Sequence, residues 1–227
     1  MNIIELRDIT FSYGEDETPV FVDYNLSIQK GKCVVFEGDN GSGKTTLFRI
    51  LNGLSFPGKG SFVFDGEEIN KKYLKDNKKS KIFHKKIGFL FQNPDVMLFN
   101  ATVFDEIAFG PRQMGMSDED VKARVEDCMQ LFDLQSLSGK APYHLSGGQK
   151  KKVALAAVMA LNPEVLILDE PFAGLDGGSQ ELLMSFLIDL KAAGKTILIA
   201  THDETIKEKL ADELVTIGKQ KQINKEI

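Results

Sequence analysis

The sequence contains little cysteine and no long apolar run. Its two cysteines, Cys33 and Cys128, lie in apolar patterns without metal-ligand spacing, so we expect two buried thiols in a reducing compartment. The longest apolar run, residues 153–161, is far shorter than the roughly 20 residues that cross a bilayer. The first residues hold no apolar run of signal-peptide length. These absences predict a cytosolic chain, or one that reaches a membrane only through a partner.

Positive charge is also in short supply. The 227 residues include 28 Lys and Arg against 33 Asp and Glu, a net charge of -5, which argues against nucleic-acid binding as the main activity. Residues 70–86 nevertheless read NKKYLKDNKKSKIFHKK. Such a segment is typical of a solvated loop, or of a loop with a helix, and contact with anionic lipid headgroups is the alternative. We expect His84 to lie there in an exposed loop.

Segments with the pattern of a strand alternate with segments of helical periodicity. Strands are expected at residues 3–13, 20–28, 33–38, 61–64, 87–91, 165–170, 196–201 and 213–217. Helices are expected at 44–54, within 101–134 with a break near Gly110 and Pro111, after Ser146, and at 180–193 and 204–211. The alternation implies a largely parallel sheet. The helical stretch interrupts it, which indicates a core of residues 1–94 and 161–227 with an inserted helical subdomain of residues 95–160.

Residues 38–45 read GDNGSGKT and match the phosphate-loop pattern G-x-x-x-x-G-K-[ST] between an expected strand and an expected helix. The glycines let backbone N–H groups turn toward phosphate oxygens. Lys44 can reach the β- and γ-phosphates, and Thr45 offers a hydroxyl to Mg²⁺. Thr46 extends the helix start, where the helix dipole favours anions. The predicted nucleotide-binding residues of this loop are Gly38, Asn40, Gly41, Ser42, Gly43, Lys44, Thr45 and Thr46.

Residues 165–170, VLILDE, form an apolar strand pattern that ends in two acids. Because adjacent strand residues point to opposite sides, we expect different tasks for them: Asp169 can hold Mg²⁺, and Glu170 can orient and polarise the attacking water. His202 follows the strand at 196–201 and can donate to the γ-phosphate. Gln92 ends the strand at 87–91, and its carboxamide can ligate Mg²⁺ and the nucleophilic water. Ligands of open α/β sheets bind at such carboxyl ends.

Residues 145–149 read LSGGQ and open the helical pattern that follows. Ser146 is a good N-cap, but Gly147 and Gly148 would each cost roughly 1 kcal/mol in a helix interior. Glycine permits close backbone approach and a helix N-terminus favours an anion, so we expect a second phosphate site here. A projecting helical subdomain cannot easily reach its own loop at 38–45. It can meet the loop of a second copy that is arranged head to tail.

Together these motifs resemble the ATP-binding cassette (ABC) family over essentially the whole chain. The resemblance implies an α/β P-loop NTPase with a mostly parallel core sheet, an antiparallel N-terminal β subdomain and an inserted helical subdomain. It also implies that Tyr13 stacks on adenine, that Asp176 communicates across a dimer, that Gln92 links the site to a membrane partner and that His202 is the switch histidine. The residues that match the signature, which closes over the ATP of the opposite subunit, are Ser146, Gly147, Gly148 and Gln149.

Residues 91–111, FQNPDVMLFNATVFDEIAFGP, resemble more narrowly the ATPase subunits of energy-coupling-factor and cobalt/nickel-type importers, although Met97 stands where those usually carry Gln. We therefore expect an ATP-hydrolysing subunit that uses ATP and Mg²⁺, peripheral on the cytoplasmic face of the cell membrane. Its expected partners are a second ABC ATPase subunit, a transmembrane coupling subunit and a small membrane substrate-binding subunit, and no nucleic acid. The groups that either receive a partner helix or pack internally are Phe91, Leu98, Phe99, Phe104 and Phe109.

The residues leave several alternatives open. The chain could serve an exporter or another class of importer. A non-transport ABC ATPase of DNA repair or translation and a regulatory subunit with a degenerate site are further alternatives. The cargo is not encoded, because such a subunit touches nucleotide and coupling helices rather than substrate, and a metal ion and a vitamin fit equally. The complete motifs are compatible with a homodimer and with a heterodimer.

Overall fold

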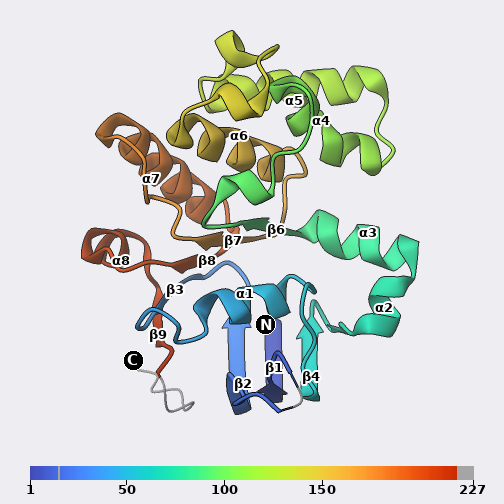
Figure 1. The fold of residues 1–227 in the computed structure, drawn as a ribbon, viewed down its shortest axis with the longest axis vertical. Coiled ribbons are helices and arrows are strands. Elements are labelled where there is room, and N and C mark those ends of the chain that lie inside the picture. The colour runs from blue at the N-terminus through green and yellow to red at the C-terminus, as the bar shows by residue number, and fades with distance from the viewer. Residues whose placement is uncertain (15, 219–227) are drawn as a thin grey trace. The chain divides into compact units, whose positions relative to one another are not determined.

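A computed structural model describes residues 1–14 and 16–218 of the chain (Figure 1). The chain divides into two compact units: unit 1 comprises Met1–His84 and the described residues from Phe186 on, and unit 2 comprises Lys85–Ser185. Each unit has its own strands and helices. The domain limits expected from the sequence stay a prediction. No helix in the described ranges is both long enough and apolar enough to cross a membrane.

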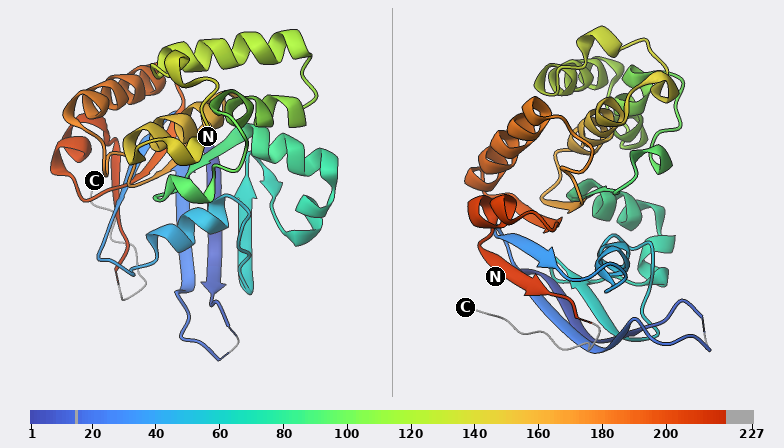
Figure 2. Two further views of the ribbon diagram at one scale, coloured as in Figure 1. Left: turned by 45° about the horizontal axis from the view of Figure 1, so that its top comes forward. Right: turned by 60° about the vertical axis from the view of Figure 1, so that its left-hand side comes forward.

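Unit 1 begins with an antiparallel sheet. Its strands are β1 (Asn2–Phe11), β2 (Phe21–Gln29), β4 (Lys59–Phe64) and β5 (Glu67–Glu68), in the order β2-β1-β4-β5. Figure 2 shows the three longer strands side by side. Along β2 the buried residues Tyr24, Leu26 and Ile28 alternate with exposed polar residues, so that one face packs into the core. This sheet is the antiparallel β subdomain that the family resemblance implied.

Unit 1 also contains three parallel strands. Strand β3 (Cys33–Glu37) pairs with β8 (Thr196–Ala200) and with β9 (Glu213–Thr216). Strands β3 and β8 are buried along nearly their whole length, as is typical of parallel strands covered on both faces. Helix α1 (Lys44–Leu51) follows β3, and helix α8 (Glu204–Leu210) follows β8. Because the strands are parallel, their carboxyl ends, and the segments that follow them, lie at one edge.

The two cysteines are buried and unbonded, as expected from the sequence. Burial raises the pKa of the Cys33 thiol to about 12 and that of the Cys128 thiol to about 11. Since the thiolate is the reactive form, both side chains act as small apolar groups of the core near neutral pH.

The lysine-rich segment forms two helices, α2 (Lys71–Lys75) and α3 (Asn77–Lys86). Phe83 is the buried residue of α3, and its ring makes edge-to-face contacts with Phe62 and Phe64 of β4, at centroid distances of 6.3 and 5.3 Å. The segment is therefore mostly helical rather than a loop. The prediction that His84 lies in an exposed loop is wrong: it lies in α3 beside the Phe83 ring, and burial lowers the pKa of its imidazole.

Unit 2 contains two parallel strands, β6 (Ile87–Leu90) and β7 (Val165–Asp169). The helical elements between them in the sequence are η1 (Pro94–Val96), α4 (Val103–Gln113), α5 (Asp118–Leu131), η2 (Gln135–Leu137), η3 (Pro142–His144) and α6 (Gly147–Met159). Helix α7 (Gly177–Ala192) starts after β7. Helices α4, α5 and α6 pack on one another, as Figure 1 shows. The helical insertion that the family resemblance implied thus lies between β6 and β7 in the chain.

The helix break expected near Gly110 and Pro111 is in the wrong place. Helix α4 continues through both residues, and the chain turns at Gly115, where φ is 76°. Pro111 has no N–H to donate to the Ile107 carbonyl, but the helix continues beyond it to Gln113, and the Met114 N–H donates to the Gly110 carbonyl at 3.0 Å. A Cβ at Gly110 would lie 3.2 Å from the Leu161 side chain. Close packing, rather than a break, accounts for this glycine.

We expect Phe83→Ala to lower the free energy of unfolding by about 3–5 kcal/mol, because it removes a buried ring and leaves a cavity. Ile82→Ala in the same helix is the matched control, since Ile82 is 47% exposed, and it should cost less than about 1 kcal/mol. Urea unfolding of both variants measures the difference. Equal losses would contradict the conclusion that Phe83 anchors α3.

Candidate active site

The glycines of the loop between β3 and α1 are required by its geometry. Gly38 and Gly43 have φ values of 144° and 112°, which side-chain-bearing residues rarely adopt. A Cβ at Gly38 would lie 2.3 Å from the carbonyl oxygen of Ile217, and one at Gly43 would lie 3.0 Å from Val20 and 3.1 Å from Phe21. Helix α1 begins directly after Gly43. The compact loop therefore leads into a helix N-terminus, where the N–H groups and the helix dipole favour an anion.

The polar side chains of this loop fit a phosphate group. Lys44 lies across the loop, where its Nζ donates hydrogen bonds to the carbonyl oxygens of Gly38 and Asp39, the latter at 3.2 Å. Ser42 is buried, and its Oγ has no hydrogen-bond partner among the residues that the structure describes. Buried hydroxyls without a partner are rare, and a phosphate oxygen would satisfy this one. The donors of the loop thus match the chemistry of a nucleotide phosphate.

Tyr13 presents an exposed aromatic ring beside the start of α1. Its hydroxyl shares a hydrogen bond of 2.8 Å with Thr46 Oγ1, and its ring lies edge-to-face against Phe11 at 5.1 Å. Tyr13 as a whole is 58% exposed. An exposed ring that is fixed at both its edge and its hydroxyl can stack on a base without further ordering of the side chain.

Glu37 at the end of β3 connects the elements around the phosphate loop. Its carboxylate accepts hydrogen bonds from Lys207 Nζ of α8 at 2.7 Å and from Thr216 Oγ1 of β9 at 2.9 Å. The Lys207 bond above all, and then the Thr216 bond, lowers the pKa of Glu37, and the charge of His202 contributes in the same direction. His202 lies exposed after β8, at the same edge. No sequence motif indicated this cluster, because Glu37 and Lys207 are 170 residues apart.

The two acids expected to share a strand do not both belong to it. Strand β7 ends at Asp169, which is buried, and Glu170 follows in a left-handed backbone conformation with φ 48°. The argument from strand alternation therefore does not apply to Glu170. A turn that is closed by the hydrogen bond from the Ala173 N–H to the Glu170 carbonyl, at 3.3 Å, sets its direction instead. Such backbone conformations are uncommon outside glycine and cluster at functional sites.

The LSGGQ stretch forms the start of α6 by a reciprocal cap. Ser146 Oγ accepts a hydrogen bond from the Gln149 N–H at 3.3 Å, and Gln149 Oε1 accepts one from the Ser146 N–H at 3.0 Å. A Cβ at Gly147 would meet nothing within 4 Å, and one at Gly148 would make only ordinary contacts at 3.7 Å. Packing within the described chain therefore does not require either glycine. Both positions leave the helix N-terminus open to a group from outside.

Asp176 and Gln92 also lie at the start of local elements. The Asp176 carboxylate accepts hydrogen bonds from the Ser179 N–H and Ser179 Oγ, each at 2.9 Å, and these bonds lower its pKa. Gln92 is exposed after β6, directly before Asn93, whose Oδ1 accepts a hydrogen bond from the Asp95 N–H. The Asp176 side chain is thus fixed at the start of α7, and Gln92 precedes a short capped segment.

The predicted site residues occur in both units. Unit 1 holds Tyr13, Gly38, Asn40, Gly41, Ser42, Gly43, Lys44, Thr45, Thr46 and His202. Unit 2 holds Gln92, Ser146, Gly147, Gly148, Gln149, Asp169, Glu170 and Asp176. Their joint role in one reaction stays a prediction. Sequence reasoning missed Glu37, because only its contacts reveal it. For the same reason it missed Glu106, which accepts hydrogen bonds from the backbone of Phe99 and Asn100, and Lys151, which donates to the carbonyl oxygens of Glu170 and Ala173.

Residues 21–173, more than half of the chain, match the family model described as ABC transporter. This chain belongs to the ABC transporter family. As an ABC protein it binds and hydrolyses ATP, and the motif-based prediction of an ATP-binding P-loop ATPase is confirmed.

Two relatives of this ABC ATPase show its position within the family. The nickel import ATP-binding protein LarO of Lactiplantibacillus plantarum is 42% identical over 225 residues, which cover 99% of this chain and 92% of the relative. The energy-coupling factor transporter ATP-binding protein EcfA of Methanothermobacter thermautotrophicus is 38% identical over 216 residues, which cover 95% and 68%. The narrower resemblance that residues 91–111 indicated is therefore confirmed.

Solved structures agree with this ABC fold. The cassette MJ0796, dimeric and bound to ADP and Pi in a post-hydrolysis state, has a TM-score of 0.86 at 28% identity, with 98% of both chains covered. The protein cbiO1 from Clostridium perfringens, part of the ABC transporter complex cbiONQ, has a TM-score of 0.82 at 33% identity, with 98% of this chain and 87% of that chain covered.

We expect Gly147→Ala to leave thermal stability unchanged or slightly raised, because the added Cβ has open space and alanine favours a helix. ATP turnover should nevertheless fall at least about 10-fold, since the methyl group blocks close approach to the helix N-terminus. Gly139→Ala, also in open space but outside the motifs, is the control. Melting curves and steady-state ATPase rates measure both effects, and unchanged turnover in Gly147→Ala would count against a binding role for LSGGQ.

Proposed function

We propose that this chain is the ATP-hydrolysing subunit that powers a membrane importer of the energy-coupling-factor or cobalt/nickel type, at the cytoplasmic face of the cell membrane. The relatives named for nickel import and for energy-coupling factor transport support this class. A metal ion and a vitamin are both compatible with it as cargo. The observation that carries the transport proposal is a set of exposed apolar side chains within residues 96–109, which follow Gln92 in the sequence.

These side chains, called the coupling patch, are Val96, Phe99 and Phe109. Their exposed fractions are 66%, 68% and 40%, and the rings of Phe99 and Phe109 lie edge-to-face at 5.0 Å. The sequence left five apolar groups divided between partner contact and internal packing. Phe99 and Phe109 are exposed, whereas Phe91, Leu98 and Phe104 are partly buried. Exposed aromatic pairs of this kind favour contact with a partner protein.

A buried carboxylate holds the coupling patch in place. Glu106 of α4 is only 4% exposed, and its Oε2 accepts hydrogen bonds from the backbone N–H groups of Phe99 and Asn100 at 2.9 and 2.7 Å. Charge-assisted bonds to backbone N–H groups are among the stronger hydrogen bonds in proteins. Phe99 therefore stands on a fixed backbone. A residue that transmits force to a partner helix needs such a support.

For the reaction we propose that Lys44 and the loop N–H groups bind the β- and γ-phosphates while Tyr13 stacks on adenine. Glu170 orients and polarises the attacking water, and His202 donates a hydrogen bond to the γ-phosphate. Bound Mg²⁺ would neutralise phosphate charge, and an oxygen donor set of Thr45, Asp169 and Gln92 suits this hard cation. Among the described residues no group of three or more His, Cys, Asp or Glu side chains could hold a metal ion.

For the assembly we propose a second ABC ATPase subunit, identical or related, whose signature covers the nucleotide of this chain. Ser146–Gln149 and Asp176 of this chain do the same for the partner. The uncovered glycines at the start of α6 support this arrangement. A transmembrane coupling subunit meets the coupling patch, and a small membrane substrate-binding subunit completes the complex. The dimeric structure of MJ0796 and the cbiONQ complex that contains cbiO1 support this composition.

We predict that Glu170→Gln binds MgATP and forms the ATP-dependent dimer but turns over at least roughly 10²-fold more slowly, because the carboxylate that polarises water is gone. Glu208→Gln, an exposed position of α8, is the control and should keep the parent rate. Nucleotide binding, size-exclusion chromatography with ATP, and phosphate release measure the three properties. Parent-like hydrolysis in Glu170→Gln would show that its assigned role is wrong.

We also predict that Phe99→Asp abolishes uptake in the assembled transporter, while the ATPase rate of the isolated chain stays within about 2-fold of the parent. The charge disrupts an apolar contact with the membrane subunit but lies on an exposed side chain. Leu54→Asp, an exposed apolar position outside the patch, is the control. Cargo uptake into proteoliposomes and ATPase rates are compared. Normal uptake in Phe99→Asp would remove the support for the coupling patch.

A further inference from the structure

Lys151 is a buried cation in helix α6, two residues after the LSGGQ stretch. Lys151 is only 5% exposed. Its Nζ donates hydrogen bonds to the carbonyl oxygen of Glu170 at 2.9 Å and to that of Ala173 at 2.6 Å. The helix that starts at the signature is thus bonded directly to the turn that carries the proposed catalytic acid.

The two carbonyl groups belong to the first and last residues of one turn. Residues 170–173 are closed by the hydrogen bond from the Ala173 N–H to the Glu170 carbonyl, and Pro171 restricts the backbone between them. Glu170 itself has φ 48°, a conformation that costs energy outside glycine and persists only when its surroundings hold it. An ammonium group that binds both ends of the turn supplies such a constraint.

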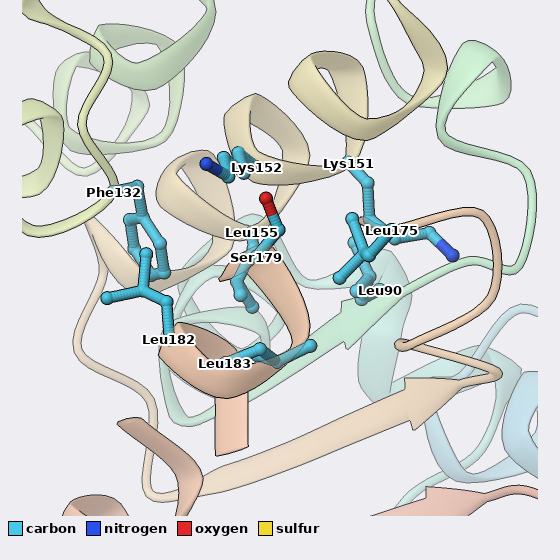
Figure 3. Close-up of a pocket in the computed structure, with 9 residues that line it drawn as sticks. All are labelled: Leu90, Phe132, Lys151, Lys152, Leu155, Leu175, Ser179, Leu182 and Leu183. Atoms are coloured by element: carbon cyan, nitrogen blue, oxygen red, sulfur yellow. The ribbon is translucent and has the colours of Figure 1, made fainter. Parts of the chain in front are cut away.

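The apolar part of the Lys151 side chain has a separate task. Together with Leu90, Leu155 and Leu175 it lines a small cavity of about 10 Å³. Figure 3 shows that the amino groups of Lys151 and Lys152 point in opposite directions from α6, and that the Lys151 amino group extends beyond this apolar lining. Burial lowers the pKa of Lys151, whereas the charges of Glu170 and Asp169 act in the opposite direction. A cation is costly to bury, so its two carbonyl partners account for its presence better than packing does.

We propose that Lys151 is a positioning residue that holds the Glu170–Ala173 turn, and with it the Glu170 carboxylate, in register with the signature helix. The proposal rests on the role proposed above for Glu170. In this arrangement a displacement of α6 moves the turn through two hydrogen bonds. Contact of a partner's nucleotide with LSGGQ and orientation of the attacking water are therefore linked inside one unit.

The test is a double-mutant cycle with Lys151→Met and Glu170→Gln in steady-state and single-turnover ATP hydrolysis. Methionine keeps the apolar stem but has no donor. We expect Lys151→Met to lower kcat at least about 10-fold with nucleotide affinity within about 2-fold of the parent. In the Glu170→Gln background the same change should alter the rate by less than about 2-fold, because the group that Lys151 positions is already absent. Lys151→Arg, which can donate to both carbonyls, should recover much of the rate. Lys122→Met, an exposed lysine of α5, is the control.

The outcomes separate the hypotheses. A kcat of Lys151→Met within about 2-fold of the parent, or equal fold losses in both backgrounds, would overturn the positioning role while leaving ATP hydrolysis by Glu170 intact. Parent-like turnover of Glu170→Gln alone would instead overturn the proposed function. If Lys151→Met shows no cooperative melting transition, Lys151→Gln replaces it, since the amide retains one donor group. Failure of both variants to fold would assign Lys151 to the fold and overturn the inference.

Discussion

Parallel pairing of β3 with β8 and β9 is the constraint on which the position of the phosphate loop in unit 1 depends. Residues from three distant parts of the chain end their strands at one edge because Val35 lies opposite both Ile199 and Leu214. At that edge the phosphate loop continues from β3, and the segment with His202 continues from β8. Glu37 then fixes the edge by bonds to α8 and β9. The glycines of the loop matter because this edge is crowded, with the Ile217 carbonyl close against Gly38.

Buried charged groups fix the functional segments of unit 2. Glu106 binds two backbone N–H groups of the segment that displays Phe99, and Lys151 binds two backbone carbonyls of the turn that begins with Glu170. In both cases a charged side chain satisfies main-chain groups of an irregular segment that has no ladder or helix to do so. Phe99 and Glu170, which are expected to act on a partner and on the nucleotide, are therefore held by buried side chains of α4 and α6. Regular secondary structure alone would not hold either segment.

Local patterns were sufficient to predict the elements whose stability is local. The phosphate loop, the Ser146 cap and the buried strands could be identified because glycine spacing, capping chemistry and apolar runs determine them within a few residues. Three features were not settled by these patterns. Helix α4 continues through Pro111 to Gln113, the lysine-rich segment is helical because Phe83 packs on β4, and Glu170 leaves the strand because a turn captures it. Each depends on contacts that the linear pattern does not contain. The roles of the site residues and the domain limits stay predictions for the same reason.

The left-handed backbone at Glu170 has a consequence for how this protein can change over time. Glycine adopts that conformation at no steric cost, so replacing the acid by glycine would relieve local strain even as it removes the group assigned to water. Stability thus favours glycine at this position, whereas the proposed catalysis requires the acid. A search for more stable variants that ignores activity would therefore accept the loss of the acid at this position.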